Sequence, residues 1–243
     1  MQRIRSRAFD AILVAWTAAF APALAILLIC GRPQGPIRAT SRVWAKGILV
    51  ALRWTVGLTH VERDRHKIPA GPCLIVANHQ SPWETIAFLT LVPEVAIVAK
   101  QELLAIPVMG WFLRHSPMII IDREGGGSAV RHMLAESRKA LEQGRPVLVF
   151  PEGGRRSASS EVEFKRGVEL LYLQLGVTVL PVALDAGRFW GADHPYKRRG
   201  AITVSYLDPI EPGLSGREFI GRAQLAVRDS LSGRAPSAQP IAA

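Results

Sequence analysis

The chain has few of the residues from which covalent cross-links and metal sites are built. Its 243 residues include two cysteines, Cys30 in a long apolar stretch and Cys73 at the start of a shorter one. Two cysteines in such places make no disulfide framework. The histidine and cysteine spacing that is typical of a zinc site is also missing. We therefore expect neither a structural disulfide nor a metal site.

Two common catalytic signatures are missing as well. Neither Ser81 nor Ser157 lies in a Gly-x-Ser-x-Gly elbow. A serine hydrolase that pairs one of these serines with His79 stays open only as an alternative. The run Gly125–Ser128 lacks the lysine that follows the glycines of a nucleotide-binding loop. We interpret this run as a link between a strand and a helix.

Acidic residues are scarce near the N-terminus. The net charge is +10, and residues 1–60 contain eight lysines and arginines but only one acid, Asp10. Evenly spread basicity would suggest a nucleic-acid partner, but here the charges bracket an apolar stretch, so we expect none. Ala11–Cys30 has no charged residue in 20 positions. As a helix this stretch would be about 30 Å long, close to the thickness of the hydrocarbon layer of a membrane.

Residues 1–60 are therefore predicted to form a helical membrane-anchoring segment. Positive charge on both sides of the apolar stretch gives no orientation across a membrane. It fits a helix embedded from one face, turned near residues 31–36, and paired with the amphipathic stretch Val43–Leu58. A cleaved signal peptide is the alternative, because Ala23–Ala25 resembles a cleavage site. The apolar run continues through Ile29, which favours a retained anchor.

Beyond residue 70, apolar runs alternate with helical patterns. This alternation predicts an α/β layered fold in which helices flank a largely parallel sheet. The expected strands cover residues 73–77, 94–99, 118–122, 146–150, 177–184 and 201–207, and the expected helices lie near 83–91, 102–113, 128–142, 165–175 and 216–231. We assign residues 61–232 to one catalytic domain. The polar, proline-containing tail 233–243 is predicted to be disordered.

The most informative segment runs from Cys73 to Glu84. An apolar strand is followed by His79, then by a plausible helix N-cap at Ser81, and then by Glu84, five residues after the histidine. Such a strand-to-helix turn brings the carboxylate back onto the imidazole ring. A carboxylate on one ring nitrogen leaves the other nitrogen free to take a proton. The pattern predicts a general base that acts on a hydroxyl group.

A second apolar strand ends in the polar run Pro151–Arg156. Glu152 lies between the strand and two glycines, where it is a candidate to bind a substrate hydroxyl or to fix the loop. Gly153 and Gly154 allow close approach of the backbone. Arg155 offers planar donors that suit a phosphate.

Four blocks of the chain, spread over residues 70–185, resemble the glycerolipid acyltransferases typified by 1-acyl-sn-glycerol-3-phosphate acyltransferase. Asn78–Glu84 looks like the His-x4-Asp motif of that family, and Phe150–Arg155 is similar to its Phe-Pro-Glu-Gly-Thr-Arg block. The other two blocks are Lys100–Leu103 with Ile106-Pro107, Gly110-Trp111 and Ile121–Arg123 downstream, and Val179–Val182. Glu84, Gly154 and Arg156 depart from the family pattern, which has Asp, Thr and Ser at these places.

The resemblance implies acyl transfer without a cofactor. His79, oriented by Glu84, would deprotonate the free hydroxyl of a lysophospholipid, which then attacks the thioester of acyl-CoA or acyl-carrier protein. Lys100, Arg155 and Arg123 would hold the acceptor's phosphate. The thioester is cytosolic, so the resemblance places the enzyme on the cytoplasmic face of the inner or plasma membrane. The expected acceptor is 1-acylglycerol-3-phosphate. A lyso-aminolipid acceptor and a non-catalytic lipid-binding protein of the membrane surface remain open as alternatives.

Overall fold

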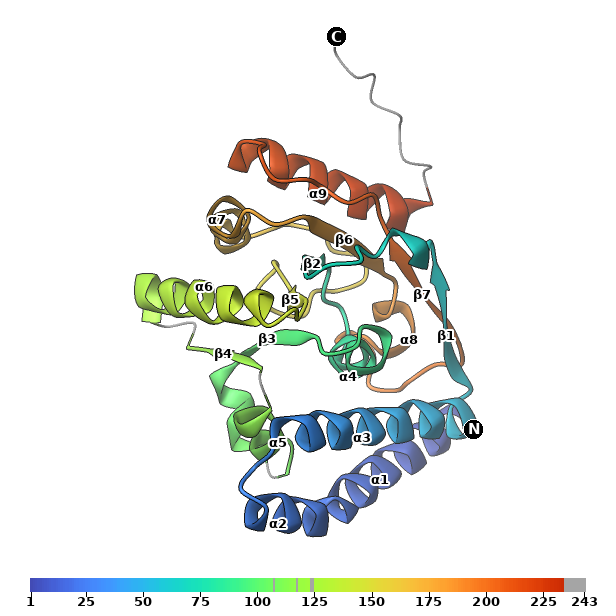
Figure 1. Ribbon diagram of the computed structural model, residues 1–243. Helices are drawn as coiled ribbons and strands as arrows, with labels where there is room; N and C mark the ends of the chain where they lie inside the picture. Colours follow the sequence, from blue (N-terminus) through green and yellow to red (C-terminus); the bar gives the residue numbers. More distant parts are fainter. Residues whose placement is uncertain (107, 117, 123–124, 234–243) are drawn as a thin grey trace.

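In the part of the chain that the structure describes, seven strands form one sheet at the centre of the molecule, in the order β1-β7-β6-β2-β5-β3-β4 (Figure 1). This computed structural model describes residues 1–106, 108–116, 118–122 and 125–233. The strands are β1 (Leu58–Arg63), β2 (Leu74–Ala77), β3 (Ala96–Lys100), β4 (Ile119–Ile121), β5 (Val147–Val149), β6 (Val179–Leu184) and β7 (Gly200–Tyr206). All neighbouring strands are parallel except β6 and β7, which are antiparallel. The predicted layered α/β fold with a largely parallel sheet is confirmed.

Helices cover both faces of the sheet because the central strands are apolar on both sides. Ile75 and Ala77 of β2 pack toward α3 (Gln34–Thr55) and α4 (Pro82–Leu91), whereas Leu74 and Val76 face the other way. The second face is covered by α6 (Gly126–Glu142), α7 (Arg166–Leu175) and α9 (Gly216–Ser232). The short elements are η1 (Arg65–Lys67), η2 (Gln101–Ala105), α5 (Met109–His115) and α8 (Gly187–Trp190).

The path of the chain marks the carboxyl ends of β2 and β5 as the expected place for a site. From β2 the chain crosses one face through α4 to reach β3, and from β5 it crosses the opposite face through α7 to reach β6. The loops after β2 and β5 thus leave toward opposite faces of the sheet. In parallel sheets, ligands usually bind at the carboxyl ends of neighbouring strands whose loops diverge in this way. The loops after β2 and β5 carry the two candidate clusters.

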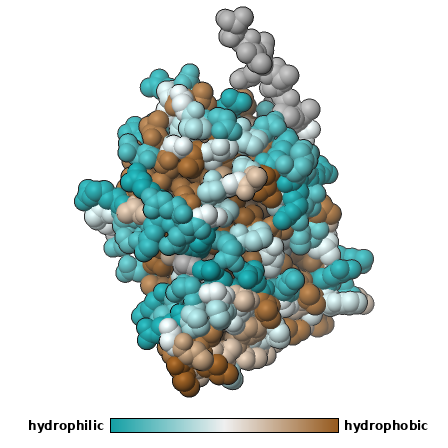
Figure 2. Space-filling view, viewed as in Figure 1, coloured by the Kyte–Doolittle hydropathy of each residue, from teal (hydrophilic) through white to brown (hydrophobic). Residues whose placement is uncertain are grey.

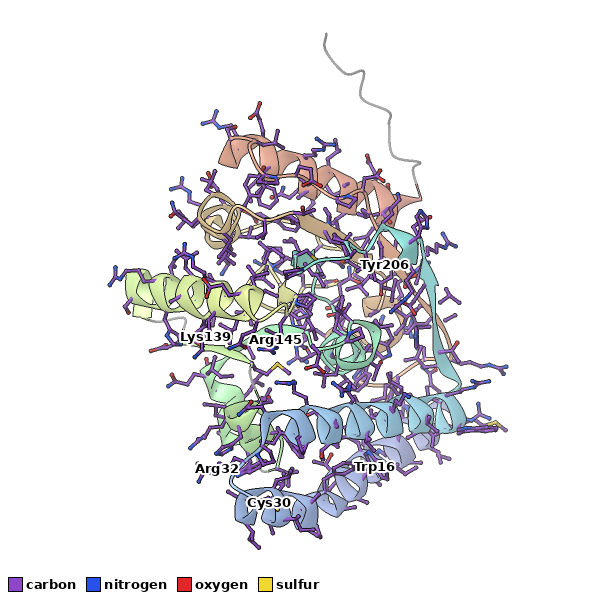
Figure 3. All side chains as sticks on the ribbon, in the orientation of Figure 1. Trp16, Cys30, Arg32, Lys139, Arg145 and Tyr206 are labelled. Atoms are coloured by element: carbon purple, nitrogen blue, oxygen red, sulfur yellow. The ribbon has the colours of Figure 1, made fainter. Side chains whose placement is uncertain are left out.

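The N-terminal residues form a helical hairpin that lies against α4 and the sheet. α1 (Gln2–Ala19) and α2 (Ala21–Ile29) are followed by a turn and by α3, which packs against both α1 and α4. Trp16 lies between α1 and α3 (Figure 3), where its indole N–H donates to the carbonyl of Trp44 at 3.0 Å. Gly47 makes this contact possible, because a Cβ there would lie 2.3 Å from the Trp16 ring.

This hairpin presents apolar side chains to solvent. Gln2–Ile29 is long and apolar enough to cross a membrane, with a mean hydropathy of 2.4 over its most apolar window and 17% of that window buried. Apolar side chains gather at the end of the molecule formed by α1 and α2 (Figure 2). The large apolar residues exposed on the hairpin are Ile4, Ile12, Val14, Ile26, Leu28, Ile29, Val43, Val50 and Trp54.

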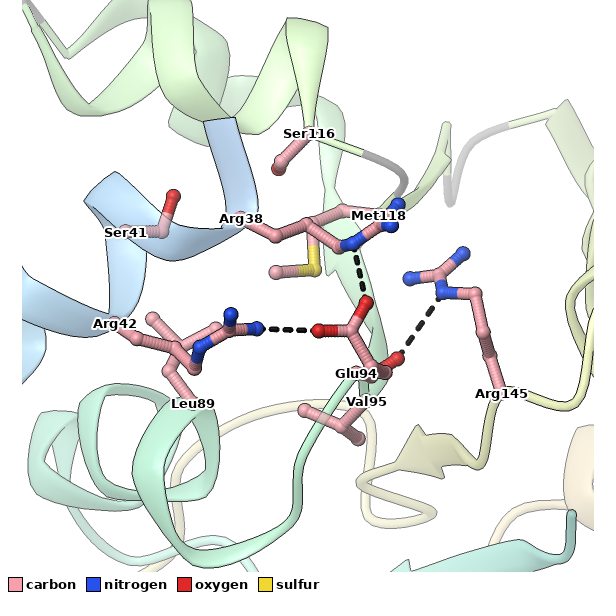
Figure 4. A pocket seen from close by; sticks show the side chains of 9 residues that line it. All are labelled: Arg38, Ser41, Arg42, Leu89, Glu94, Val95, Ser116, Met118 and Arg145. Carbon is pink, nitrogen blue, oxygen red and sulfur yellow. Dashed lines mark hydrogen bonds and ion pairs between the residues drawn. The ribbon is translucent and has the colours of Figure 1, made fainter. Parts of the chain in front are cut away.

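Glu94 joins α3 to the amino ends of the strands. Its carboxylate forms ion pairs with Arg38 and Arg42 of α3, and its carbonyl accepts a hydrogen bond from Arg145 Nε at 3.1 Å (Figure 4). Burial, together with the nearby Arg38, lowers the pKa of Arg145. The pocket between these side chains has about 20 Å³ of free space, enough for a water molecule. It lies at the amino ends of β3 and β5, whereas His79 lies at the carboxyl end of β2.

The structure corrects three details of the predicted elements. β1 was not predicted, and it forms an edge strand whose later residues are exposed. The apolar stretch 11–30 is not one helix but ends α1 near Phe20 and continues as α2. The predicted helix 102–113 is divided into η2 and α5. The predicted boundary at residue 60 stays a prediction. Phe9 and Leu52 from before it pack in the same apolar cluster as β2.

Candidate active site

β2 delivers His79 to the carboxyl edge of the sheet. The strand is fully buried and ends at Ala77, and Asn78 then fixes the start of the loop. The Asn78 side-chain amide donates to the carbonyl of Leu184 and accepts from its N–H, both at 2.8 Å. Because Leu184 ends the neighbouring strand β6, the loop is attached to two strands at once. His79 therefore starts from a rigid base.

The turn into α4 brings Glu84 back onto the imidazole. Ser81 caps the helix by accepting from the N–H of Trp83 at 3.1 Å, and Pro82 occupies the first helical position. Glu84 Oε2 lies 2.5 Å from His79 Nδ1. The N–H of Gln80 donates to both carboxylate oxygens, at 3.1 and 3.2 Å. The longer glutamate side chain thus reaches the ring where the resembled family has aspartate.

The two members of the dyad differ in burial. Glu84 is fully buried, and this burial raises the pKa of its carboxyl group, while the hydrogen bond to His79 and the backbone N–H groups oppose the rise. The His79 side chain is 15% exposed, so part of it is reachable from outside. Its ring stacks on Phe150 with centroids 4.1 Å apart. With Nδ1 held by Glu84, Nε2 is the nitrogen available for proton transfer.

The loop after β5 is bound to the His79 loop. Glu152 is 2% exposed, and its Oε2 accepts a hydrogen bond from the backbone N–H of His79 at 3.3 Å. The N–H of Arg156 donates to the carbonyl of His79 at 2.7 Å. Burial raises the pKa of Glu152 to about 7, assisted by the Glu84 charge and opposed by the His79 N–H and Arg156. Of the two roles predicted for Glu152, this geometry favours fixing the loop.

Gly153 is required by both conformation and space. Its φ of +72° lies in the left-handed region, which disfavours side chains. A Cβ at this position would also lie 2.9 Å from Lys165 Nζ. The Lys165 side chain therefore passes directly over the glycine, and the N–H of Lys165 binds the carbonyl of Pro151 at 2.9 Å. The loop is held from both ends.

Two of the three predicted phosphate ligands lie in described parts of the chain, at or after the carboxyl ends of β3 and β5. Lys100 ends β3 and is half-buried, and Arg155 is exposed in the loop after β5. Both strands lie beyond β2 in the direction of β4. Within the described ranges no hydrogen bond or ion pair engages the Arg155 guanidinium. Arg123, the third predicted phosphate ligand, lies outside the described residues.

The structure also shows positioning residues to which sequence reasoning gave no role. Asn78 binds Leu184, Gln80 Oε1 accepts from the N–H of Gly187 at 3.1 Å, and Phe150 supports the imidazole ring. The only local signal was a polar pair, Asn78 and Gln80, on either side of the histidine. Both are buried.

The serines of the alternative hydrolase are engaged elsewhere. Ser81 is buried and caps α4, and Ser157 binds Ser159 at 2.8 Å and also the carboxylate of Asp193. In the part of the chain that the structure describes, neither hydroxyl forms a hydrogen bond with His79. The same residues contain no group of three or more His, Cys, Asp or Glu side chains placed to hold a metal ion.

Comparisons with known proteins agree with this geometry. Residues 59–185 match the family described as Acyltransferase. The chain is 34% identical to 1-acyl-sn-glycerol-3-phosphate acyltransferase of Pseudomonas aeruginosa over 176 residues, 71% of this chain and 68% of that protein. It is 31% identical to the lyso-ornithine lipid O-acyltransferase of the same species, over 86% of this chain and 85% of that protein.

A solved structure has the same fold. The crystal structure of the 1-acyl-sn-glycerophosphate acyltransferase of Thermotoga maritima superposes with a TM-score of 0.77, covers 98% of both chains and is 20% identical in sequence. The match extends over the N-terminal hairpin as well as the sheet, because it covers nearly the whole chain.

Proposed function

Because this chain belongs to the Acyltransferase family, we propose that it transfers a fatty acyl chain to the free hydroxyl of a lysophospholipid. The observation that carries the proposal is the contact of 2.5 Å between His79 Nδ1 and Glu84 in the loop that follows β2. The proposed acceptor is 1-acylglycerol-3-phosphate, and the product is phosphatidic acid. The proposed donor is acyl-CoA or acyl-carrier protein.

The chemistry needs one base and no acyl-enzyme. His79 Nε2 takes the proton of the acceptor hydroxyl, and the oxygen attacks the thioester carbonyl. When the tetrahedral intermediate collapses, the new C–O ester bond remains and the C–S bond breaks. The imidazolium returns its proton to the departing thiolate, so His79 ends the cycle neutral. Glu84 stabilises the imidazolium between these steps.

Lys100 and Arg155 are proposed to bind the acceptor's phosphate. Both are cations at the carboxyl ends of strands close to β2, and a guanidinium can meet two phosphate oxygens at once. This placement would hold the glycerol hydroxyl near His79 while the acyl chain lies toward the hairpin. Arg123 retains its predicted role as a proposal from the sequence.

A second acceptor class is supported by one observation. The lyso-ornithine lipid O-acyltransferase matches 86% of this chain, a longer stretch than the 71% matched by the phosphate-directed relative. A lyso-aminolipid has no phosphate, so it would not need Arg155. The choice of acceptor therefore depends on the loop after β5, whose Gly154 and Arg156 also differ from the resembled family.

The hairpin is proposed to embed in the membrane from one face. The exposed apolar residues of α1 and α2 suit a lipid surface, and arginines such as Arg5, Arg7 and Arg53 suit anionic headgroups. The donor thioester is made in the cytosol, which favours the cytoplasmic leaflet. The acceptor would then reach His79 from the lipid side, and the donor would reach it from the water.

One assay tests the proposed function. Purified full-length protein in detergent is incubated with labelled acyl-CoA or acyl-carrier protein and a panel of lyso-acceptors, and the product is identified by mass spectrometry. His79→Ala should abolish turnover while circular dichroism and melting temperature stay close to wild type. Glu84→Gln should lower kcat by about 10³–10⁴-fold, because it keeps the size but removes the charge. Wild-type turnover in His79→Ala would refute the mechanism.

A further inference from the structure

A groove of about 580 Å³, lined by charged, aromatic and small apolar side chains, opens at the carboxyl end of β6, beside the catalytic loops. Its volume is in the range of sites for ligands the size of a nucleotide. The polar and aromatic side chains that line it are Asp185, Arg188, Phe189, His194, Arg198 and Arg199. None of these residues takes part in the proposed mechanism.

The charge of the groove suits an anion. Three arginines face one carboxylate, Asp185, and that carboxylate is already engaged. Its Oδ1 accepts from the N–H of Thr203 at 2.7 Å, and its Oδ2 lies 3.9 Å from Arg188 Nη1. The Arg188 side chain is 70% exposed, and among the described side chains the Arg198 guanidinium has one hydrogen bond, to His194 Nδ1 at 3.3 Å. The groove therefore retains positive charge that its own residues do not neutralise.

The groove is joined directly to the loop of the catalytic base. The N–H of Gly187, at the start of α8, donates to Gln80 Oε1 at 3.1 Å, and Gln80 follows His79 in the chain. A Cβ at Gly187 would lie 2.8 Å from Gln80 and 3.1 Å from Ala158, so α8 packs closely on both catalytic loops. Ala158 and Arg188 both line the groove. A ligand in the groove thus lies next to the His79 loop.

Two cationic regions adjoin the His79 loop. The first is formed by Lys100, at the end of β3, and by Arg155, which precedes Arg156, whose N–H binds the His79 carbonyl. The second is formed by the groove arginines, which follow β6 or precede β7. Acyl transfer brings together two phosphate-bearing molecules, so two separate anion sites are needed when the donor is acyl-CoA. The acceptor phosphate is assigned to the first region.

We propose that the groove of Arg188, Arg198 and Arg199 binds the phosphorylated nucleotide end of an acyl-CoA donor. The inference rests on the proposed function and specifies its donor. The flexible pantetheine arm would run from the groove to the thioester at His79. The guanidinium groups bind the phosphates, and the half-buried ring of Phe189 offers apolar surface to the adenine.

Binding of adenosine 3′,5′-bisphosphate to the full-length protein tests this site without turnover. Calorimetry should show one site in wild type, with an affinity that falls as salt is added. Arg188→Ala with Arg198→Ala should weaken this affinity at least about tenfold, because two charge-assisted contacts are lost. Arg217→Ala with Arg222→Ala is the matched control, since it removes two exposed arginines from α9 on the other face of the sheet. The control should bind like wild type.

Kinetics identify the donor. The Arg188→Ala, Arg198→Ala variant should raise KM for acyl-CoA roughly tenfold and leave kcat and the acceptor KM unchanged. A truncated acyl-N-acetylcysteamine donor, which lacks the nucleotide, should be used equally by both proteins. The proposal is overturned if wild type does not bind the bisphosphate, if the truncated donor is affected equally, or if only acyl-carrier protein loses affinity. Failure of the proposed function would instead show as bisphosphate binding without turnover on any lyso-acceptor.

Discussion

Glu152 has a carboxyl group whose protonation changes near neutral pH because it is buried between the two catalytic loops. Burial raises its pKa to about 7 in the folded protein, well above the ordinary value for glutamate in an unfolded chain. The folded protein therefore holds this proton to higher pH than the unfolded chain does. The resulting stabilisation is complete below the ordinary glutamate pKa and is lost as the pH rises through 7.

Glu152→Gln should remove this pH dependence. Between pH 5 and pH 8 the free energy of unfolding of wild type should fall, relative to that of the variant, by about 2.5 kcal/mol. Urea unfolding at several pH values in that range measures the difference. The glutamine oxygen can still accept from the N–H of His79, so the loop contact is kept. A constant difference across the range would show that Glu152 is ionised throughout.

Arg155 should affect capture of the acceptor rather than the chemical step. A charge-assisted contact to phosphate is worth about 1.5–3 kcal/mol, so Arg155→Ala should raise the acceptor KM roughly ten- to a hundredfold. The donor KM should change little. Arg155→Lys should recover only part of the loss, since an ammonium cannot make the bidentate contact. A neutral monoacylglycerol, if it is a substrate, should be used equally by both proteins.

Equal damage to donor and acceptor kinetics would contradict this assignment of Arg155. So would a large loss of melting temperature, because truncation of the exposed Arg155 side chain should disturb little internal packing. The comparison also separates the two acceptor classes. If the preferred acceptor is a lyso-aminolipid, its KM should be insensitive to Arg155→Ala.

The sequence predicted the dyad but not the contacts that hold it. The turn between His79 and Glu84 is local, so its residue types and spacing were sufficient to predict it. The hydrogen bonds that hold Asn78 and Gln80 are made with Leu184 and Gly187, which lie more than 100 positions further along the chain. No local pattern specifies such partners. They follow from the order of the strands, which the sequence did not reveal.

Among the secondary-structure elements, the buried strands could be predicted from the sequence, but the edge strand β1 could not. Strands such as β2 and β6 are apolar on both faces and read as continuous apolar runs. β1 is an edge strand with only Leu58 buried, so its sequence has no clear apolar period. The antiparallel pairing of β6 with β7 also has no sequence signal, because it depends on the direction in which the chain returns.

The tip of the hairpin should determine membrane affinity. Ile26 and Ile29 of α2 are 61% and 86% exposed, so charging them disturbs little internal packing. Ile26→Asp with Ile29→Asp should lower binding to anionic vesicles at least about tenfold, because two charges would enter the apolar layer. Leu170→Asp with Leu173→Asp is the matched control, since these residues are exposed with the same spacing on α7.

Flotation with liposomes measures this difference, and the assay in detergent shows whether the dyad is intact. The double substitution in α2 should reduce activity on bilayer acceptor more than activity on a dispersed short-chain acceptor. Equal vesicle binding by both double variants would contradict the hairpin as the membrane contact. Removal of residues 1–60 is a poorer test, because Phe9 and Leu52 belong to the central apolar cluster.

At the scale of the whole molecule, the N-terminal helix and the catalytic body form one structure. Phe9 is fully buried and packs edge-on against Trp190, with centroids 5.5 Å apart. Asp10 binds Lys197 Nζ at 2.5 Å, and Ser6 accepts from the N–H of Lys197 at 3.2 Å. The segment that these contacts hold runs from α8 to β7, and it also lines the proposed donor groove.

These contacts argue against a cleaved signal peptide. Cleavage after Ala25 would remove Asp10 and leave the Lys197 ammonium, whose side chain is 7% exposed, without its carboxylate. Loss of one partner of a buried ion pair destabilises a protein by about 3–5 kcal/mol, and less here because Asp10 is itself half exposed. We therefore expect the protein extracted from membranes to retain residues 1–25, as measured by intact mass spectrometry.

A variant pair tests the physical reason behind that expectation. Asp10→Asn should lower the free energy of unfolding by more in wild type than in a Lys197→Met background, because methionine removes the charge that needs Asp10. If the two losses are equal, the ion pair does not fasten α1 to the catalytic body. If the intact mass instead shows a new N-terminus near Ile26, the hairpin of α1 and α3 does not survive in the mature enzyme. The acceptor would then have to be recognised without it.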